Sequence, residues 1–158
     1  TRLAKKFTAQ AAASLLTCTA DLSKFLLANI SHNSVLSKTS ITKMSLPETF
    51  INDIGVYGLG PHLYSQNNQN SKIIGHDGSG NNAINTAARI DLLSKNGIII
   101  LETGNHNLAS NLADEWLFVQ AGIADYVVIM RNKSYLIKLF VGGVLVILAM
   151  AFYLRKKL

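Results

Sequence analysis

The residues with the clearest chemical potential lie in one glycine-rich stretch, Ile74-Gly75-His76-Asp77-Gly78-Ser79-Gly80. An imidazole can exchange a proton near neutral pH, and glycine lets another molecule approach the backbone closely. The pattern therefore predicts a binding or reaction site at residues 76–79. It also fits a plain alternative, in which His76 is a polar residue on an exposed strand and Gly78 forms a bulge.

The same glycines allow a second chemistry, dinucleotide binding. Gly78-Ser79-Gly80-Asn81-Asn82-Ala83 fits the pattern Gly-x-Gly-x-x-Gly/Ala, helical spacing follows it, and Glu102 ends a strand about 20 residues further on. Against this, the apolar run before the glycines is short, and Asn96-Gly97 is a strong signal for an antiparallel hairpin. A dinucleotide-binding protein thus remains the weaker alternative.

Other catalytic and metal-binding patterns are weak. The four histidines are far apart in the sequence and lack the close spacing of a zinc site on one helix, so we predict no metal and no cofactor. Ser40-Ile41-Thr42-Lys43 fits Ser-x-x-Lys, but a four-residue pattern with two free positions recurs easily in a stretch rich in serine and lysine. Without a nucleophile and its base, this chain alone forms no acyl-enzyme.

The elements that would position residues 76–79 are helices and antiparallel strands, which predicts an α+β fold with an antiparallel sheet flanked by helices. Asn96-Gly97 predicts a hairpin, and the apolar spacing of Leu112, Trp116 and Val119 predicts the inner face of a helix closed by Gly122. The other expected elements are a helix from a cap at Thr17 or Thr19 to Ile30, loop and short helix over 31–54, strands at 56–64, 72–76, 87–93 and 98–100, a turn at 66–70, and the helix 107–121.

Several of these segments, in this order, carry a family resemblance. His76-Asp77-Gly78 resembles the His-x-Gly of an edge strand, with Tyr57-Gly58-Leu59-Gly60 on the strand before it and Gly97-Ile98-Ile99-Ile100-Leu101 on the last strand. Upstream, residues 15–26 and Val35-Leu36-Ser37 resemble a helix and its continuation. Together they resemble the serine β-lactamase and penicillin-binding-protein superfamily, in its class C-like branch, over most of residues 10–121.

The resemblance implies roles for the glycine-rich stretch. His76 would lie against the catalytic hydroxyls and help position substrate and proton transfer, and the Ser79 backbone N–H would be an oxyanion donor, a contribution of ~3 kcal/mol in a well-studied case. Asp77 and Gly78 would bind a small-molecule or peptide substrate. The nucleophilic Ser-x-x-Lys of that superfamily has no convincing counterpart here, so we expect it in a missing N-terminal half of the same domain. A non-catalytic, membrane-tethered binding module on the same scaffold is the main alternative.

The C-terminus predicts a membrane anchor. Residues 139–154 contain no charge, and extending the run back to Tyr135 gives about 20 residues, the length that crosses ~30 Å of hydrocarbon. Arg155-Lys156-Lys157 follow as a stop-transfer cluster. We expect a domain at 1–130, an anchor at 131–154 and a basic tail at 155–158. The protein would be single-pass, with the domain extracytoplasmic and the tail cytoplasmic.

The distribution of charge supports a lipid bilayer as a partner and argues against nucleic acid. The formal net charge is +6, but residues 1–133 hold eleven Lys and Arg against nine Asp and Glu, which is only +2. The remaining four positive charges flank the apolar run. Basic residues concentrated beside a hydrophobic segment are typical of the membrane interface rather than of a surface that follows phosphates.

Overall fold

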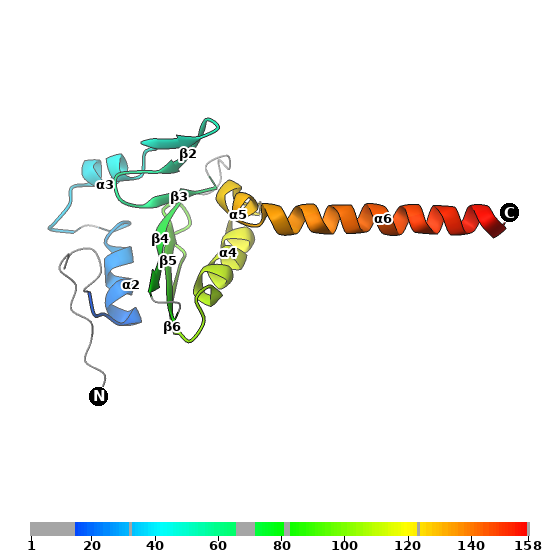
Figure 1. The fold of residues 1–158 in the computed structure, drawn as a ribbon. Helices are drawn as coiled ribbons and strands as arrows, with labels where there is room; N and C mark the ends of the chain where they lie inside the picture. Colours follow the sequence, from blue (N-terminus) through cyan, green and yellow to red (C-terminus); the bar gives the residue numbers. More distant parts are fainter. Residues whose placement is uncertain (1–14, 32, 66–71, 81–82, 123, 158) are drawn as a thin grey trace.

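The structure is a computed structural model that describes residues 15–31, 33–65, 72–80, 83–122 and 124–157. Its described strands form one antiparallel sheet of six, in which each strand pairs with its neighbours in the sequence (Figure 1). The predicted α+β class with an antiparallel sheet is confirmed. The strands are β1 Thr49–Ile51, β2 Ile54–Tyr57, β3 His62–Tyr64, β4 Ile73–Gly80, β5 Ile84–Asp91 and β6 Gly97–Thr103.

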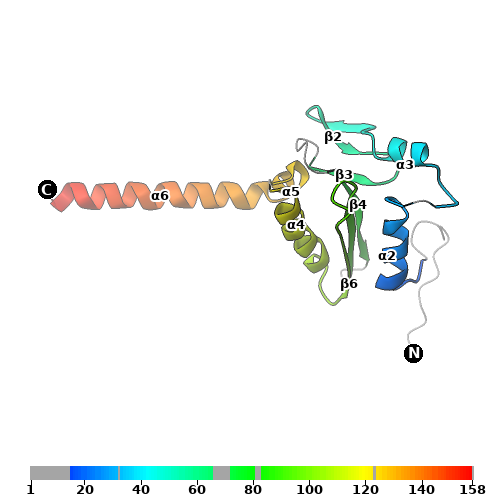
Figure 2. The ribbon, with the colours of Figure 1, turned by 180° about the vertical axis from the view of Figure 1, so that it is seen from behind.

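Helices lie on both faces of this sheet. Helix α2 covers one face and α4 the other, and α6 projects far from the domain on the side where α4 and α5 lie (Figures 1 and 2). The helices are α2 Thr19–Leu27, α3 Lys38–Met44, α4 Leu108–Ala121, α5 Tyr126–Arg131 and α6 Lys133–Lys157.

The face under α2 is closed by apolar side chains. Leu26 of α2 packs with Leu63, Ile74 and Ile90 from three neighbouring strands. The prediction for this helix was right in place and wrong in detail: its N-cap is Cys18, without a side-chain cap bond, and the helix ends at Leu27 instead of Ile30. Of its apolar residues, only Leu26 is buried.

The face under α4 differs from the prediction. The helix begins after Asn107 and ends at Gly122, whose φ of 70° gives the expected left-handed cap. Its inner face, however, is made of Ala109, Ala113 and Leu117, so the predicted inner face was wrong. Small side chains allow a helix to approach a sheet closely, and Ala109 and Ala113 pack directly on Ala87 of β5. Of the predicted face, Trp116 is partly buried, whereas Leu112 is 48 % and Val119 80 % exposed.

All four predicted strands differ from the observed ones in their bounds, and β4, expected at 72–76, extends to Gly80. The strand expected over 56–64 is two strands, because the chain reverses between β2 and β3 at a turn in which Gly60 has a φ of 114°. The hairpin expected at Asn96-Gly97 is confirmed as the β5–β6 pair, but Gly97 already pairs with Ile90, and the left-handed turn residue is Lys95. Strand β1 lies within the region expected to be loop and short helix, and the turn expected at 66–70 lies outside the described residues.

Among the described helices, α6 is the one long and apolar enough to cross a membrane. Its span Lys133–Lys156 has a mean hydropathy of 2.3, and no part of that window is buried inside the protein. It follows α5 after a single residue, Asn132.

Candidate functional site

His76 lies at a step in the sheet, beside the end of β3. Strand β3 pairs with β4 only from Tyr64 opposite Ile73 to His62 opposite Gly75. The rings of Tyr57 and His62 gather round the exposed His76, with 4.8 Å between the two imidazole centroids and 5.9 Å from the His76 centroid to that of Tyr57. The step therefore assembles two imidazoles and a phenol from three strands.

The hydrogen bonds of His76 define its tautomer. Its Nδ1 lies 2.6 Å from the carbonyl oxygen of Asp77, which can only accept, so Nδ1 carries the proton. Its Nε2 lies 2.5 Å from the Tyr57 hydroxyl. In the neutral ring Nε2 accepts this hydrogen bond, and Tyr57 holds the imidazole in orientation.

Beyond this step, one edge of β4 has no partner strand among the described residues. Residues 77–80 of β4 pair with β5 on one side, whereas β3 has already ended on the other. In a strand, the N–H and C=O of one residue point to the same side, and the side alternates from residue to residue. The Gly78 carbonyl accepts from the Asn85 side chain of β5, whereas the Asp77 carbonyl meets His76. By this alternation, the N–H of Ser79 points to the open edge, on the same side as the Asp77 carbonyl.

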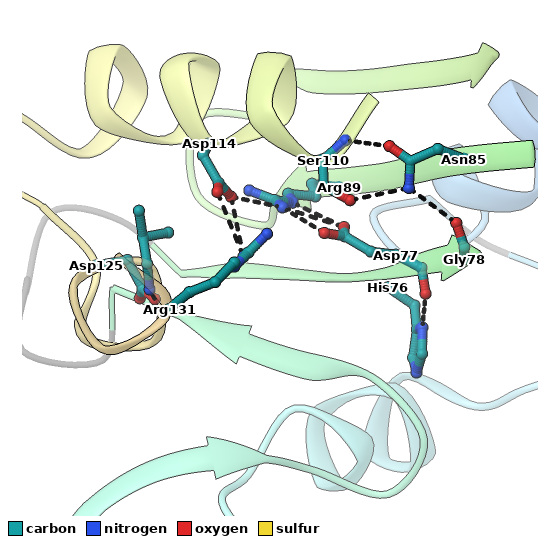
Figure 3. Close-up of polar contacts among 10 residues, drawn as sticks. His76, Asp77, Gly78, Asn85, Arg89, Ser110, Asp114, Asp125 and Arg131 are labelled. Atoms are coloured by element: carbon teal, nitrogen blue, oxygen red, sulfur yellow. Dashed lines mark hydrogen bonds and ion pairs between the residues drawn. The ribbon is translucent and has the colours of Figure 1, made fainter. Parts of the chain in front are cut away.

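The Asp77 side chain turns to the opposite face, where it meets a buried arginine (Figure 3). Arg89 of β5 is completely buried, and its Nη2 donates to both carboxylate oxygens of Asp77, at 3.1 and 2.9 Å. The same nitrogen lies 2.9 Å from Asp114 of α4, which also pairs with Arg131 of α5 at 3.3 Å. Asp77, Arg89, Asp114 and Arg131, which we call the charge chain, thus link β4 through α4 to the end of α5, next to the start of α6.

The environment of Arg89 keeps it charged. Burial by itself disfavours the guanidinium, but Tyr64, Asp77 and Asp114 outweigh it and raise the pKa of Arg89. The guanidinium carbon also lies 4.4 Å from the ring centroid of Tyr64. Gly75 lies opposite Arg89 on β4, and a Cβ there would collide with both the backbone of β5 and the Cγ atom of Arg89.

A neutral hydrogen-bond cluster lies beside the charge chain (Figure 3). Asn85 of β5 is 2 % exposed, and its amide nitrogen donates to the Gly78 carbonyl at 3.1 Å and to the Ser110 hydroxyl at 3.2 Å. Its oxygen accepts from the Ser110 backbone N–H in the first turn of α4. Asn85 therefore joins the open half of β4 to α4.

Burial lowers the pKa of His62, and the nearby His76 lowers it further. His62 therefore stays neutral to a lower pH than an ordinary histidine.

The predicted site residues are contiguous on β4 but face different ways. His76 and Ser79 are exposed, whereas the Asp77 carboxylate is held on the α4 side by Arg89. Gly78 lies opposite Thr86, and a Cβ at Gly78 would collide with the Thr86 hydroxyl. The packing of β4 against β5 therefore favours glycine at position 78, independently of any role in binding.

Sequence reasoning missed Tyr57, His62 and Arg89. The turn signal Gly58-Leu59-Gly60-Pro61 could have revealed the first two, since a reversal there brings the ends of β2 and β3 together. Ser40, the candidate nucleophile of the Ser-x-x-Lys match, lies in the first turn of α3 and contacts the cap residue Ser37 through both its N–H and its hydroxyl.

The dinucleotide alternative loses its structural premise. Residues 84–91, which had to form the helix after the glycines, are strand β5, and β4 pairs with it antiparallel. A dinucleotide site of that type needs parallel strands joined by a helix. In the described part of the chain, no group of three or more His, Cys, Asp and Glu side chains could hold a metal ion.

Comparison with models of protein families, with curated proteins and with solved structures found no match to the chain. Function is therefore inferred from the geometry of the sheet edge and its neighbours.

Proposed function

We propose that this chain is the C-terminal part of a membrane-anchored serine hydrolase of the β-lactamase and penicillin-binding-protein superfamily. The reaction would be hydrolysis of an amide, peptide or ester through an acyl-enzyme, with the nucleophile supplied by a missing N-terminal half of the domain. The observation that carries the proposal is the open edge of β4 at residues 77–80, with the exposed His76 at its base.

An open strand edge suits acyl transfer because it offers fixed backbone donors. In this proposal the Ser79 N–H donates to the oxygen that becomes negative when the acyl carbon is attacked. A positioned donor of this kind stabilises the transition state by ~3 kcal/mol in a water-excluded site. The backbone of Asp77 would bind the substrate along the same edge, and Gly78, which has no side chain, would let the substrate approach the strand closely. The Asp77 carboxylate holds the strand through Arg89.

His76 is proposed to work beside the incoming hydroxyl group. Its Nε2 now faces Tyr57 and would exchange protons with the nucleophile or its base when the missing half is present. Tyr57 then acts as a positioning residue, because it orients the ring.

The far edge of the sheet gives the missing half a place to join. Strand β6 ends the strand order, and its outer side pairs with no strand in the described structure. Ile98, Ile99 and Ile100 are only partly covered. An unpaired apolar strand of this length favours addition of further strands.

The helix α6 is proposed to anchor this domain in a bilayer as a single span. A short basic tail is typical of the cytoplasmic side, so the domain would lie outside the cytoplasm. The partners in this proposal are a small-molecule or peptide substrate and lipid.

The test is covalent labelling with a fluorophosphonate and a fluorescent penicillin. We expect no labelling of the present chain and labelling of an N-terminally extended protein. In the extended protein, His76→Ala should slow labelling, whereas the matched control His106→Ala, in the loop before α4, should not. If neither protein is labelled, the serine-enzyme proposal fails, and a non-catalytic, membrane-tethered module becomes the better description.

A further inference from the structure

The outer face of α4 carries an apolar surface that the fold leaves uncovered. Leu108, Leu112, Phe118 and Val119 are 41 %, 48 %, 53 % and 80 % exposed. They follow the helical repeat along the side opposite Ala109, Ala113 and Leu117, which face the sheet. The exposed polar residues Asn111 and Glu115 also lie on this side, and Glu115 contributes one charge. We call the four apolar residues the outer face of α4.

The outer face of α4 looks toward the side from which α6 departs. In both ribbon views the sheet separates α4 from α2, and α6 extends away on the α4 side (Figures 1 and 2). A bilayer crossed by α6 therefore lies on the side of α4 that is turned away from the sheet.

The direction of α6 is held by specific contacts. Backbone hydrogen bonds run from Asn132 to Val128 and from Leu136 to Asn132, so the helical pattern continues from α5 into α6. Arg131 pairs with Asp114 in the middle of α4. The anchor is thus connected to α4 by an ion pair as well as by the chain.

The spacing along α6 places the domain at the level of the lipid headgroups. Only Lys133 and Ser134 of α6 precede the run of about 20 residues that begins at Tyr135, and two residues rise about 3 Å at 1.5 Å per residue. A headgroup layer is about 5–8 Å thick on each side of the hydrocarbon. This leaves little room for a water layer between α5 and the membrane.

The charges at this junction fit the same surface. A shallow hollow where α5 meets α6 is lined by Met130, Arg131, Lys133, Ser134, Ile137 and Lys138. Three cations beside apolar side chains favour anionic headgroups next to acyl chains.

We propose that the outer face of α4 lies on the membrane surface, with Leu112, Phe118 and Val119 inserted at the boundary between headgroups and acyl chains. The proposal rests on the anchor part of the proposed function and is independent of its hydrolase part. It holds the domain in one orientation, with α2 on the side of the sheet away from the bilayer.

The test uses the full chain reconstituted in phosphatidylcholine vesicles that contain phosphatidylserine. An environment-sensitive NBD label is attached at position 119 in the double variant Cys18→Ser, Val119→Cys, and, as the matched control, to the native exposed Cys18 at the start of α2. We expect a blue-shifted emission and strong quenching by shallow doxyl-labelled lipids at position 119, and water-like emission with little quenching at Cys18.

A second variant checks the contact without relying on one label site. Leu112→Glu in the position-119 background should reduce the quenching, whereas Phe25→Glu on α2, where Phe25 is 67 % exposed, should leave it unchanged. Equal, water-like emission at both label sites would overturn the proposal. Shielding of position 119 in native membranes but not in lipid vesicles would also overturn it, in favour of a protein partner.

Alkaline carbonate extraction separates this result from failure of the anchor. A chain that stays in the vesicles but shows no quenching at position 119 refutes only the docked orientation. A chain that carbonate releases refutes the span itself, and with it both proposals about the membrane.

Discussion

The two faces of the sheet are closed by different kinds of interaction. Under α2, Leu26, Leu63, Ile74 and Ile90 form an apolar cluster whose contacts have no preferred direction. The α4 face combines a cluster of small apolar side chains with the buried Arg89, which is paired with acidic groups on both the sheet and the helix. Apolar packing tolerates substitution by residues of similar volume, whereas buried charges require their partners in place.

This difference matters because the open edge of β4 is backed by the polar face. Asp77 and Gly78 are held from the α4 side by Arg89 and Asn85. The position of the candidate site is therefore set by directional bonds, and the α2 face supplies stability without fixing that edge. Substitutions on each face should separate these two contributions.

Arg89→Met should have the largest effect. It leaves the carboxylates of Asp77 and Asp114 facing each other without their shared cation, and breaking a buried pair in this way costs about 4 kcal/mol. The measurement is urea denaturation of the full chain in nanodiscs, followed by the fluorescence of Trp116, the single tryptophan.

Two further variants make the Arg89 result specific. Arg131→Met removes a cation that pairs with Asp114 but is 39 % exposed, so it should cost less than about 1 kcal/mol. Adding Asp77→Asn and Asp114→Asn to Arg89→Met should recover part of the loss, because the orphaned charges are gone. No recovery would mean that Arg89 acts by filling volume instead of by charge.

Leu63→Ala should rank second. Leu63 is 2 % exposed in the cluster under α2, and truncation of such a side chain costs about 3 kcal/mol through lost transfer energy and a residual cavity. Leu59→Ala, at a site that is 55 % exposed, is the control and should change stability by less than about 0.5 kcal/mol. Leu63 packs on the α2 face, whereas Arg89 pairs with Asp114 on the α4 face. The effects of Leu63→Ala and Arg89→Met on the free energy of unfolding should therefore add in the double variant.

Local signals explain which elements the sequence predicted well. The end of α4 follows from Gly122, whose own backbone adopts the left-handed cap conformation. Asn96-Gly97 marked the place of the β5–β6 hairpin correctly, although the left-handed turn residue is Lys95. The step in the sheet at His76 was not predicted, because residues 56–64 were interpreted as one strand. The turn between Tyr57 and His62 lies in the middle of that predicted strand. A single extended strand would keep those two rings far apart.

The remaining errors depend on packing, which a local pattern does not contain. Helix α4 has two apolar stripes, one with Leu112 and Val119 and one with Ala109 and Ala113, and only the fit of small side chains against β5 decides which is buried. The charge chain joins residues 12 or more positions apart in the sequence, and an arginine at position 89 gives no local sign of being fully buried.

Asn85→Ala should have a smaller effect on the polar face. It removes two donated bonds and the acceptor for the Ser110 N–H, and leaving these buried groups unsatisfied costs about 2 kcal/mol. Asn111→Ala, at an exposed position of α4, is the matched control. Hydrogen exchange on the two variants should show faster exchange of the amides of β4 residues 77–80 only for Asn85→Ala. If the exchange of these amides is unchanged, the polar face does not stabilise the open edge of β4.

The smallest effect is a dependence of stability on pH that comes from His62. Burial and the neighbouring His76 lower the pKa of His62, so the unfolded chain takes up a proton that the folded chain resists. Stability contributed by the neutral ring is therefore complete above the ordinary histidine pKa of about 6.5 and declines as the pH falls through that value toward the lowered pKa of the folded state. His62→Gln should flatten this decline in urea denaturation measured between about pH 5 and 8. His106→Gln, at an exposed histidine before α4, is the control for the loss of one imidazole. A decline equally steep in both variants would assign the pH dependence to a group other than His62.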